Sequence, residues 1–338
     1  MDPFDTYFIG MTLSGRFKVL KRHEVIHEAP TACRTYEAQD DEGNIVFVKV
    51  LVPDASMSLD EQRRQIDEFV YEITLVERCG ERNMRRIVRA LASDKLLIPG
   101  MVPIAVHYFV LEWAERDLRS FEAPCEVTHL AATLRFLHQM ATALFEIHFS
   151  RVVHQNLSPP NVVQMPDGKT KLAGFRHARS LDHPRPHGDI PFDQTNAPPE
   201  VLYAGRIDSF DERCAVDLYH LGSLGCYLLV NAGATAQLER RLPHMFHWTR
   251  WQGSFVDALL TLQTAHENMI RELAPRIHEL VREELTRALR ELTEPNPTER
   301  GHPRNVDGSG PRYSPERYIS LFIRLARMVE VHLLKRVS

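Results

Sequence analysis

The sequence predicts an α+β protein in two parts, a small β-rich part with one helix and a larger helical part. Up to about residue 114, apolar and polar side chains alternate over short runs, as they do in strands. From about residue 125 the apolar side chains recur at helical spacing instead. A chain of 338 residues is longer than a domain with a single hydrophobic core usually is. We therefore expect an extension at 1–14, a small lobe at 15–114 and a large lobe at 115–338.

The small lobe is expected to hold strands near residues 16–26, 33–39, 45–52, 92–99 and 105–114. Its single helix is predicted to begin after Ser58, because Ser58 and Glu61 have the spacing of a capping box. On this helix Ile66, Phe69, Val70, Ile73 and Val76 recur at intervals of three and four residues, which predicts one buried face.

The large lobe is expected to hold long helices. The runs at 129–150 and 216–230 carry apolar residues on most faces, which is typical of buried helices. The region 252–291 is helical but broken at Pro275, and an amphipathic helix over 314–337 is expected to pack on this lobe.

The composition is that of a globular protein without a strong charge bias. Hydrophobic residues make up 43% and charged residues 25%, which excludes a disordered chain, and a net charge of −4 favours neither nucleic acid nor anionic membranes. No apolar run reaches membrane-spanning length and no signal peptide is evident, so we expect a cytoplasmic protein without stable membrane insertion. The five scattered cysteines form no C-x-x-C motif, so we expect free thiols.

Three short motifs in the large lobe occur in a fixed order. They are HQNLSPPN at 154–161, KLAGFRHARSL at 171–181 and NAPPEVL at 196–202. This order resembles the eukaryotic-type protein kinase fold, which has H-R-D-L-K-P-x-N, D-F-G and A-P-E at these places. The resemblance runs from about residue 15 to the end, and it implies a bilobal α+β kinase-like fold with a nucleotide pocket.

Several positions keep the residue that the kinase resemblance implies. Lys49 corresponds to the strand lysine that contacts nucleotide phosphates, and Glu72 to its ion-pair partner. Glu112 and Ala114 correspond to the hinge that binds adenine, and Leu111 to the gatekeeper position. Asn161 corresponds to the asparagine that holds a metal. Three further matches are structural in the family: Asp217, Glu200 and Arg300. A purely structural role for the Lys49–Glu72 pair, linking sheet to helix, is an equally good interpretation.

Other positions depart from the kinase pattern in ways that weaken phosphotransfer. Asn156 replaces the aspartate that accepts the substrate proton, and a neutral amide has no useful basicity. Ser158 replaces a lysine that neutralises phosphate charge, and Gly174 replaces the D-F-G aspartate that ligates the metal. In the segment that covers the nucleotide, Glu28, Pro30 and Cys33 stand where the family has glycines.

These departures predict a degenerate kinase-like protein, a pseudokinase, that is not an enzyme. We expect no catalytic residue, no bound metal, and ATP binding that is absent or weak. The expected role is a scaffold or allosteric regulator that binds proteins, an active kinase among them, and no nucleic acid. Two alternatives stay open: an atypical nucleotide-dependent transfer, such as unorthodox phosphorylation or AMPylation, and a nucleotide sensor without catalysis.

Overall fold

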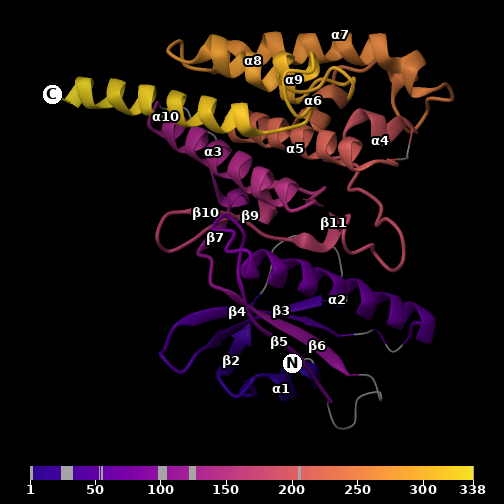
Figure 1. Ribbon diagram of the computed structural model, residues 1–338, viewed down its shortest axis with the longest axis vertical. Helices are drawn as coiled ribbons and strands as arrows, with labels where there is room; N and C mark the ends of the chain where they lie inside the picture. The colour runs from indigo at the N-terminus through magenta and orange to yellow at the C-terminus, as the bar shows by residue number, and fades with distance from the viewer. Residues whose placement is uncertain are drawn as a thin grey trace. The chain divides into compact units, whose positions relative to one another are not determined.

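The computed structural model describes residues 3–23, 33–52, 54, 56–97, 105–121, 127–204 and 207–337. The chain divides into two compact units. The first unit comprises Met1–Glu115, Gln164–Lys169 and Pro184–Asp189, and the second comprises Arg116–Val163, Thr170–His183 and Ile190–Ser338. The predicted α+β class is confirmed, since the first unit is built on a sheet and the second is mainly helical (Figure 1).

The first unit is organised by an antiparallel sheet of six strands in the order β1-β2-β3-β4-β6-β5. Alternate side chains are buried on β4, whereas Tyr108, Phe109 and Val110 are buried in succession on β6, because neighbouring residues of a strand face opposite sides and pack into two separate clusters. The strands are β1 (Thr12–Leu13), β2 (Phe17–Arg22), β3 (Cys33–Gln39), β4 (Ile45–Leu51), β5 (Ala90–Leu96) and β6 (Val106–Glu112).

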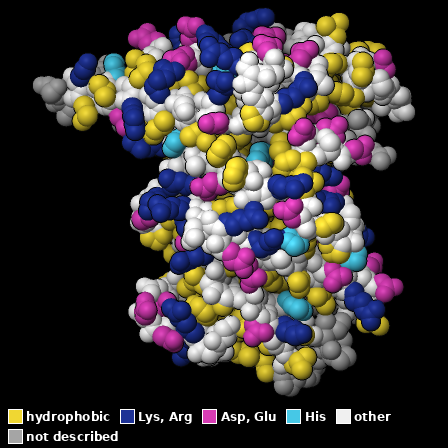
Figure 2. Space-filling model, in the orientation of Figure 1, with side chains coloured by type: hydrophobic (Ala, Val, Ile, Leu, Met, Phe, Trp, Pro, Cys, Tyr) yellow, Lys and Arg dark blue, Asp and Glu magenta, His cyan; other side chains and the backbone are white. Residues whose placement is uncertain are grey.

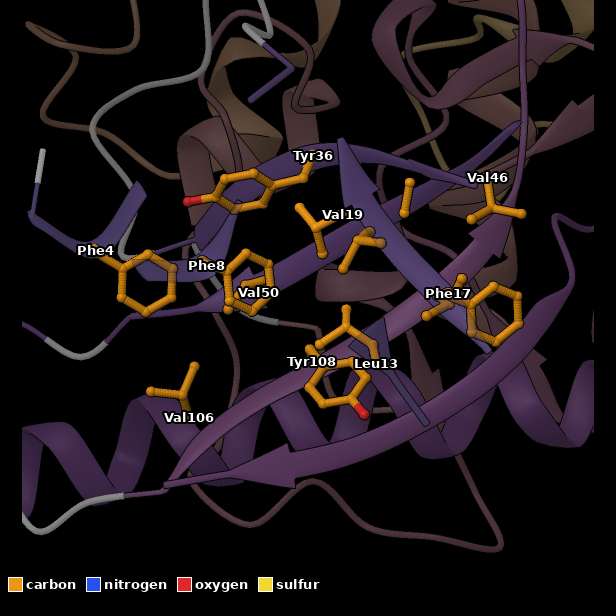
Figure 3. Close-up of a cluster of buried hydrophobic side chains, with 13 residues drawn as sticks. Phe4, Phe8, Leu13, Phe17, Val19, Tyr36, Val46, Val50, Val106 and Tyr108 are labelled. Atoms are coloured by element: carbon orange, nitrogen blue, oxygen red, sulfur yellow. The ribbon is translucent and has the colours of Figure 1, made fainter. Parts of the chain in front are cut away.

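A short helix, α1 (Pro3–Phe8), lies within the expected extension and packs on this sheet. Phe4 and Phe8 are fully buried and stack on each other with their ring centroids 5.2 Å apart. Figure 3 shows both rings beside Tyr36 of β3, within the cluster of buried apolar side chains. Phe4 and Phe8 therefore belong to the core of the first unit, because these two aromatic side chains, one helical turn apart, face the sheet.

The long helix of the first unit is α2 (Leu59–Glu81). It begins as predicted, with Ser58 as N-cap and Glu61 completing a capping box. Phe69, Ile73 and Val76 are buried, but Val70 is 38% exposed. The expected apolar face was thus wrong at Val70, and the buried face extends instead to Tyr71, Glu72 and Leu75.

The second unit is built from helices around α5 (Phe210–Val230), whose central residues are almost all buried. Gly222 and Gly225 allow α8 to approach closely, because a Cβ at Gly225 would lie 2.6 Å from Cδ2 of Leu289. The other helices are α3 (Val127–Phe149), α4 (Pro199–Ala204), α6 (Ala234–Glu239), α7 (Phe255–Leu273), α8 (Arg282–Leu292), α9 (Pro303–Val306) and α10 (Glu316–Val337).

The last helix, α10, lies along α3, as Figure 1 shows. The predicted packing of the closing helix is confirmed, since Tyr318, Phe322 and Leu325 are fully buried. Five short strands complete the fold: β7 (Arg116–Asp117), β8 (Val152–Val153), β9 (Val162–Gln164), β10 (Thr170–Leu172) and β11 (Arg179–Ser180). Within the described ranges, no helix combines the length and the apolar character that a bilayer span requires.

Candidate functional site

In the first unit, Lys49 and Glu72 form a close ion pair between β4 and α2. Nζ of Lys49 donates to both carboxylate oxygens of Glu72, at 3.0 and 2.9 Å, and the Glu72 side chain is only 5% exposed. The ammonium lies 5.8 Å from the ring centroid of Phe109, within cation–π range. Phe109 packs with Phe69 of α2, so an apolar layer supports the pair and fixes the helix against the sheet.

The expected hinge residues lie at the end of β6. Glu112 binds the backbone of Arg89 with both its own backbone and its side chain. Its N–H donates to the carbonyl of Arg89 at 3.1 Å, and its carboxylate accepts from the N–H of Arg89 at 2.8 Å. Leu111 pairs with Phe47 of β4 and packs beside the layer under Lys49. Ala114 follows the strand, where its backbone groups are outside the ladder.

The segment Pro184–Asp189, which is distant from α2 in the sequence, also packs on that helix within the first unit. Arg185 has a side chain only 1% exposed; its guanidinium lies 5.5 Å from the ring centroid of Tyr71 and 3.9 Å from the Glu68 carboxylate. His187 contacts Asp67 at 2.8 Å through Nε2, and its carbonyl accepts from Arg64. Sequence reasoning missed this contact, because no local pattern links residues more than 100 positions apart.

In the second unit, Asp217 organises the loop that carries the first motif. It is fully buried and accepts from the backbone N–H groups of His154 and Gln155, at 2.8 and 2.6 Å, and from Nε2 of His148 at 2.8 Å. Burial alone would raise the pKa of Asp217, but the hydrogen bond and charge of His148 hold it below its ordinary value. Gln155 takes a positive φ of 60°, so these contacts also hold a strained backbone.

His154 connects this loop to the second motif. Its Nε2 is 2.9 Å from the carbonyl oxygen of Ala173, and its ring meets that of Phe175 edge-on at 5.0 Å. Phe175 is fully buried, which fixes the short 3₁₀ turn from Phe175 to His177. The two motifs are thus brought together inside the second unit, at the places where the resemblance expects them.

The polar side chains of this loop bind one another. Nδ2 of Asn161 donates to the carbonyl of Asn156 at 2.9 Å and to Oγ of Ser158 at 3.3 Å. Oγ of Ser158 is in turn 3.4 Å from Oδ1 of Asn156. The amide of Asn161 therefore connects two other residues of the same loop by hydrogen bonds. Asn156 supplies no ionisable group for proton transfer.

Gly174 lies directly against Asn161. Its φ of 75° is in the left-handed region, and a Cβ at this position would lie 2.6 Å from Cγ of Asn161 and closer still to its Oδ1. No side chain fits without displacing Asn161. Of the metal ligands that the kinase resemblance implies, the carboxylate is missing, and the described residues contain no cluster of three His, Cys, Asp or Glu. The residues present here do not fit a magnesium ion.

Glu200 and Arg300 form a buried bidentate pair. Nη1 and Nη2 of Arg300 donate to the two oxygens of Glu200 at 2.6 and 2.8 Å, and the Arg300 side chain is fully buried. Arg300 also donates to the carbonyls of Ala215 and Glu294, so it joins α4, α5 and the segment after α8. Burial would lower the pKa of Arg300, but the charge of Glu200 raises it above its ordinary value.

An arginine lies next to Gln155, where the kinase motif has its own arginine. Nη1 of Arg213 donates to Oε1 of Gln155 at 3.0 Å, and its Nη2 donates to the carbonyl of Ile207. No local pattern predicts this contact, since Arg213 is on α5. Of the three positions in the expected nucleotide-covering segment, Glu28 and Pro30 lie outside the described residues, and Cys33 begins β3.

Comparison with known proteins gives related sequences but no matching family model. Cyclin-dependent kinase 17 of Caenorhabditis elegans is 25% identical over 202 residues, which are 56% of this chain and 28% of that protein. Cyclin-dependent kinase 2 of Caenorhabditis elegans is 29% identical over 122 residues, which are 35% of this chain and 32% of that protein. The matches thus span about a third of each relative, and together with the antiparallel sheet they support a protein-kinase-like fold.

These relatives correct one prediction. The sequence pattern led us to expect that the chain is not an enzyme, but both relatives bear the names of kinases, which are enzymes. The prediction relied on the replaced residues at 156, 158 and 174 and on the missing glycines at 28, 30 and 33. Replacement of single groups lowers a rate by a finite factor and does not by itself remove an activity.

Proposed function

We propose that this chain is a kinase-like regulatory protein that acts by binding other proteins, and in which ordinary magnesium-dependent phosphotransfer is strongly weakened. One observation carries the proposal: the side chain of Asn161 fills the space at Gly174 where a metal-binding carboxylate would extend. Loss of a general base alone typically lowers a rate by about 10²–10⁴, and here a base and a metal ligand are both replaced.

The contacts that hold the fold together support a binding role. Asp217 keeps its three hydrogen bonds and Arg300 its bidentate pair with Glu200, so the second unit retains a rigid frame while the groups for chemistry differ. A rigid surface binds a partner with less loss of conformational entropy than a mobile one.

Exposed apolar side chains on α7 offer a surface for a protein partner. Val256 and Leu260 are 73% and 77% exposed and share one helical face, and Met245, in the turn before α7, is 68% exposed. Large exposed apolar side chains in a group often mark a protein-binding surface. On the face that Figure 2 shows, acidic and basic side chains are intermixed, which favours a protein over nucleic acid as partner.

A binding experiment tests the regulatory role. Leu260→Asp places a charge on the exposed face of α7 and should remove the partner in pull-downs of the full chain from its native cell. The matched control is Leu97→Asp, which changes a side chain that is 73% exposed in the first unit and should keep the partner. Equal recovery of the same partners with both variants would contradict the proposed α7 surface.

A second candidate is an atypical nucleotide-dependent transfer. The formed ion pair between Lys49 and Glu72 favours it, because this lysine is the residue that would contact nucleotide phosphates in a kinase-like pocket. Mass spectrometry after incubation with ATP distinguishes the candidates, since added AMP or phosphate that Lys49→Met abolishes would favour transfer. ATP that raises the melting temperature without any added group would favour a nucleotide sensor.

A further inference from the structure

A cavity lies in the second unit between α8, the loop that follows α9 and the first turns of α10. Its volume is about 660 Å³, which is within the range of about 300–1,000 Å³ that small-molecule sites usually have. Charged side chains of α8 and α10 line it, and they are Glu284, Arg287, Glu291, Glu316, Arg317 and Arg324. A lining with both signs of charge favours a ligand that carries charges of its own.

Two of the three arginines in this lining already have a carboxylate partner. Nη1 and Nη2 of Arg324 donate to the two oxygens of Glu284, so each of these groups neutralises the other. Arg287 pairs with Glu283, one turn earlier on α8, at 2.7 Å. These pairs leave little positive charge of Arg287 and Arg324 for a ligand.

Arg317 is in a different position, because no carboxylate in the part of the chain that the structure describes pairs with it. Its Nε donates to Oδ1 of Asn305 at 2.9 Å, and this neutral amide is only 4% exposed. His302, which also lines the cavity, adds no charge near neutral pH, because burial and the charges of Arg317 and Arg304 lower its pKa. The terminal nitrogens of Arg317 are therefore suited to a ligand carboxylate.

Two carboxylates of the lining likewise form no ion pair within the described ranges, Glu291 and Glu316. Glu291 accepts from the neutral hydroxyl of Tyr318 at 2.9 Å. Burial raises the pKa of Glu291, in spite of this hydrogen bond and the charges of two arginines on α8, so a cation placed beside it would be favoured. Glu316 is exposed at the start of α10, where a ligand entering the cavity can reach it.

We propose that this cavity binds a free basic amino acid of the lysine and arginine class. The charges that it leaves without a partner are one guanidinium and two carboxylates, and such a ligand carries one carboxylate and two cationic groups. Arg317 binds the α-carboxylate, Glu316 binds the α-ammonium group, and Glu291 binds the side-chain cation. This activity goes beyond the proposed binding of proteins and does not depend on it.

The two ends of the cavity are separate, which favours a ligand with a long side chain. The pKa of Glu291 responds to the arginines of α8 rather than to Arg317, so these two charges are not close neighbours. The methylene groups of lysine and arginine place the side-chain cation well away from the α-carboxylate. Ala288 and Leu321, which also line the cavity, offer apolar contact to those methylene groups.

Isothermal titration calorimetry of the full chain with L-arginine and L-lysine tests the site. Saturable binding with a Kd of about 1 mM or lower is expected. Three analogues each remove one charge of arginine: citrulline lacks the guanidinium, agmatine lacks the carboxylate and N-acetyl-arginine lacks the α-ammonium group. Each analogue should bind at least about tenfold more weakly than arginine, because each loses one charged hydrogen-bonding group.

Substitutions assign each contact to its residue. Glu291→Gln can still accept from Tyr318, and it should weaken arginine binding about tenfold but leave citrulline binding unchanged, since citrulline has no side-chain charge to lose. By the same reasoning, Arg317→Gln should weaken arginine and leave agmatine unchanged. The matched control is Glu272→Gln, which alters a carboxylate on α7 that is 64% exposed and outside the cavity, and it should change nothing.

Two results would overturn the proposal at the level of the ligand. One is no saturable binding of either amino acid at about tenfold above 1 mM. The other is agmatine binding as tightly as arginine, which would mean that the cavity takes a lone cation such as a basic side chain of a partner protein. Equal weakening of arginine and citrulline in Glu291→Gln would overturn the assigned contact with the side-chain cation.

Discussion

The side chain of Asn161 occupies the space into which any side chain at position 174 would extend. A Cβ on Gly174 would lie 2.6 Å from Cγ of Asn161, and Nδ2 of Asn161 donates to the carbonyl of Asn156. Because Asn161 is fixed by this bond, the loss of the D-F-G carboxylate is built into the packing of the second unit. A single substitution cannot simply restore a metal ligand here.

Gly174→Ala should therefore destabilise the chain beyond the cost of its backbone conformation. A non-glycine residue at positive φ typically costs about 1–3 kcal/mol. Gly168 has the same φ of 75° with nothing within 4 Å of its Cβ position, so Gly168→Ala measures that cost alone. Urea unfolding should show a larger loss for Gly174→Ala, and Asn161→Ala should reduce the excess. Equal losses for the two alanine variants would show that Asn161 gives way freely.

Breaking the buried pair between Glu200 and Arg300 from one side should lower stability strongly. Arg300→Met would leave the Glu200 carboxylate without its two charged hydrogen bonds, at a cost of about 3–5 kcal/mol in unfolding free energy. An exposed pair, Arg287 with Glu283, supplies the comparison: Arg287→Met should change stability by about 0.5 kcal/mol or less. Similar losses from both substitutions would argue against a structural role for Arg300.

Stability should fall as the pH is lowered below about 6.5, the ordinary pKa of histidine. Burial lowers the pKa of His266 to about 3, so the folded chain keeps this side chain neutral. Between these two pKa values the unfolded chain binds more protons, which makes the free energy of unfolding decrease with falling pH. His266 contributes a loss of roughly 2 kcal/mol between pH 7 and pH 5.

Comparing wild type with His266→Gln by urea unfolding at pH 7 and pH 5 checks this sign. Nε2 of His266 contacts Oγ1 of Thr293 at 2.9 Å, and the glutamine amide can replace it as donor. The variant should lose less stability than wild type between the two pH values. An identical pH dependence would mean that His266 does not titrate differently in the folded and unfolded chain.

Arg185 should stabilise α2 from a segment remote in sequence. Arg185→Ala removes a buried guanidinium from between Glu68 and Tyr71, so hydrogen exchange should rise in the middle of α2. Arg63→Ala changes an exposed side chain on the same helix and should have little effect. Unchanged hydrogen exchange in Arg185→Ala would mean that the contact of Arg185 does not stabilise α2.

The sequence predicted those parts of the fold that depend on local patterns. The capping box at Ser58 and Glu61 fixed the start of α2, and the apolar run at 216–230 indicated the buried α5. Packing of α1 was missed, because six residues carry too little periodicity to be assigned. Val70 was misassigned because spacing alone does not show where a buried face ends, and the buried side of α2 includes Tyr71 instead.

The candidate site was predictable where motif spacing determines it. Lys49 with Glu72 and Glu200 with Arg300 do lie in contact as the resemblance implied. Contacts made by single long side chains across the fold left no local signal, as with Arg213 on Gln155 and Arg185 on α2. The sequence shows that position 174 carries neither glutamate nor aspartate. It does not show that Asn161 occupies the space that such a side chain would need.

The most direct measurement of the central claim is the steady-state phosphotransfer rate of the purified chain with Mg²⁺, ATP and a generic protein acceptor. We predict a rate at least about 10²–10⁴ below that of an ordinary kinase, and one that Asn156→Ala leaves nearly unchanged. A rate typical of kinases, on the order of 1–100 per second, that Asn156→Ala abolishes would contradict it.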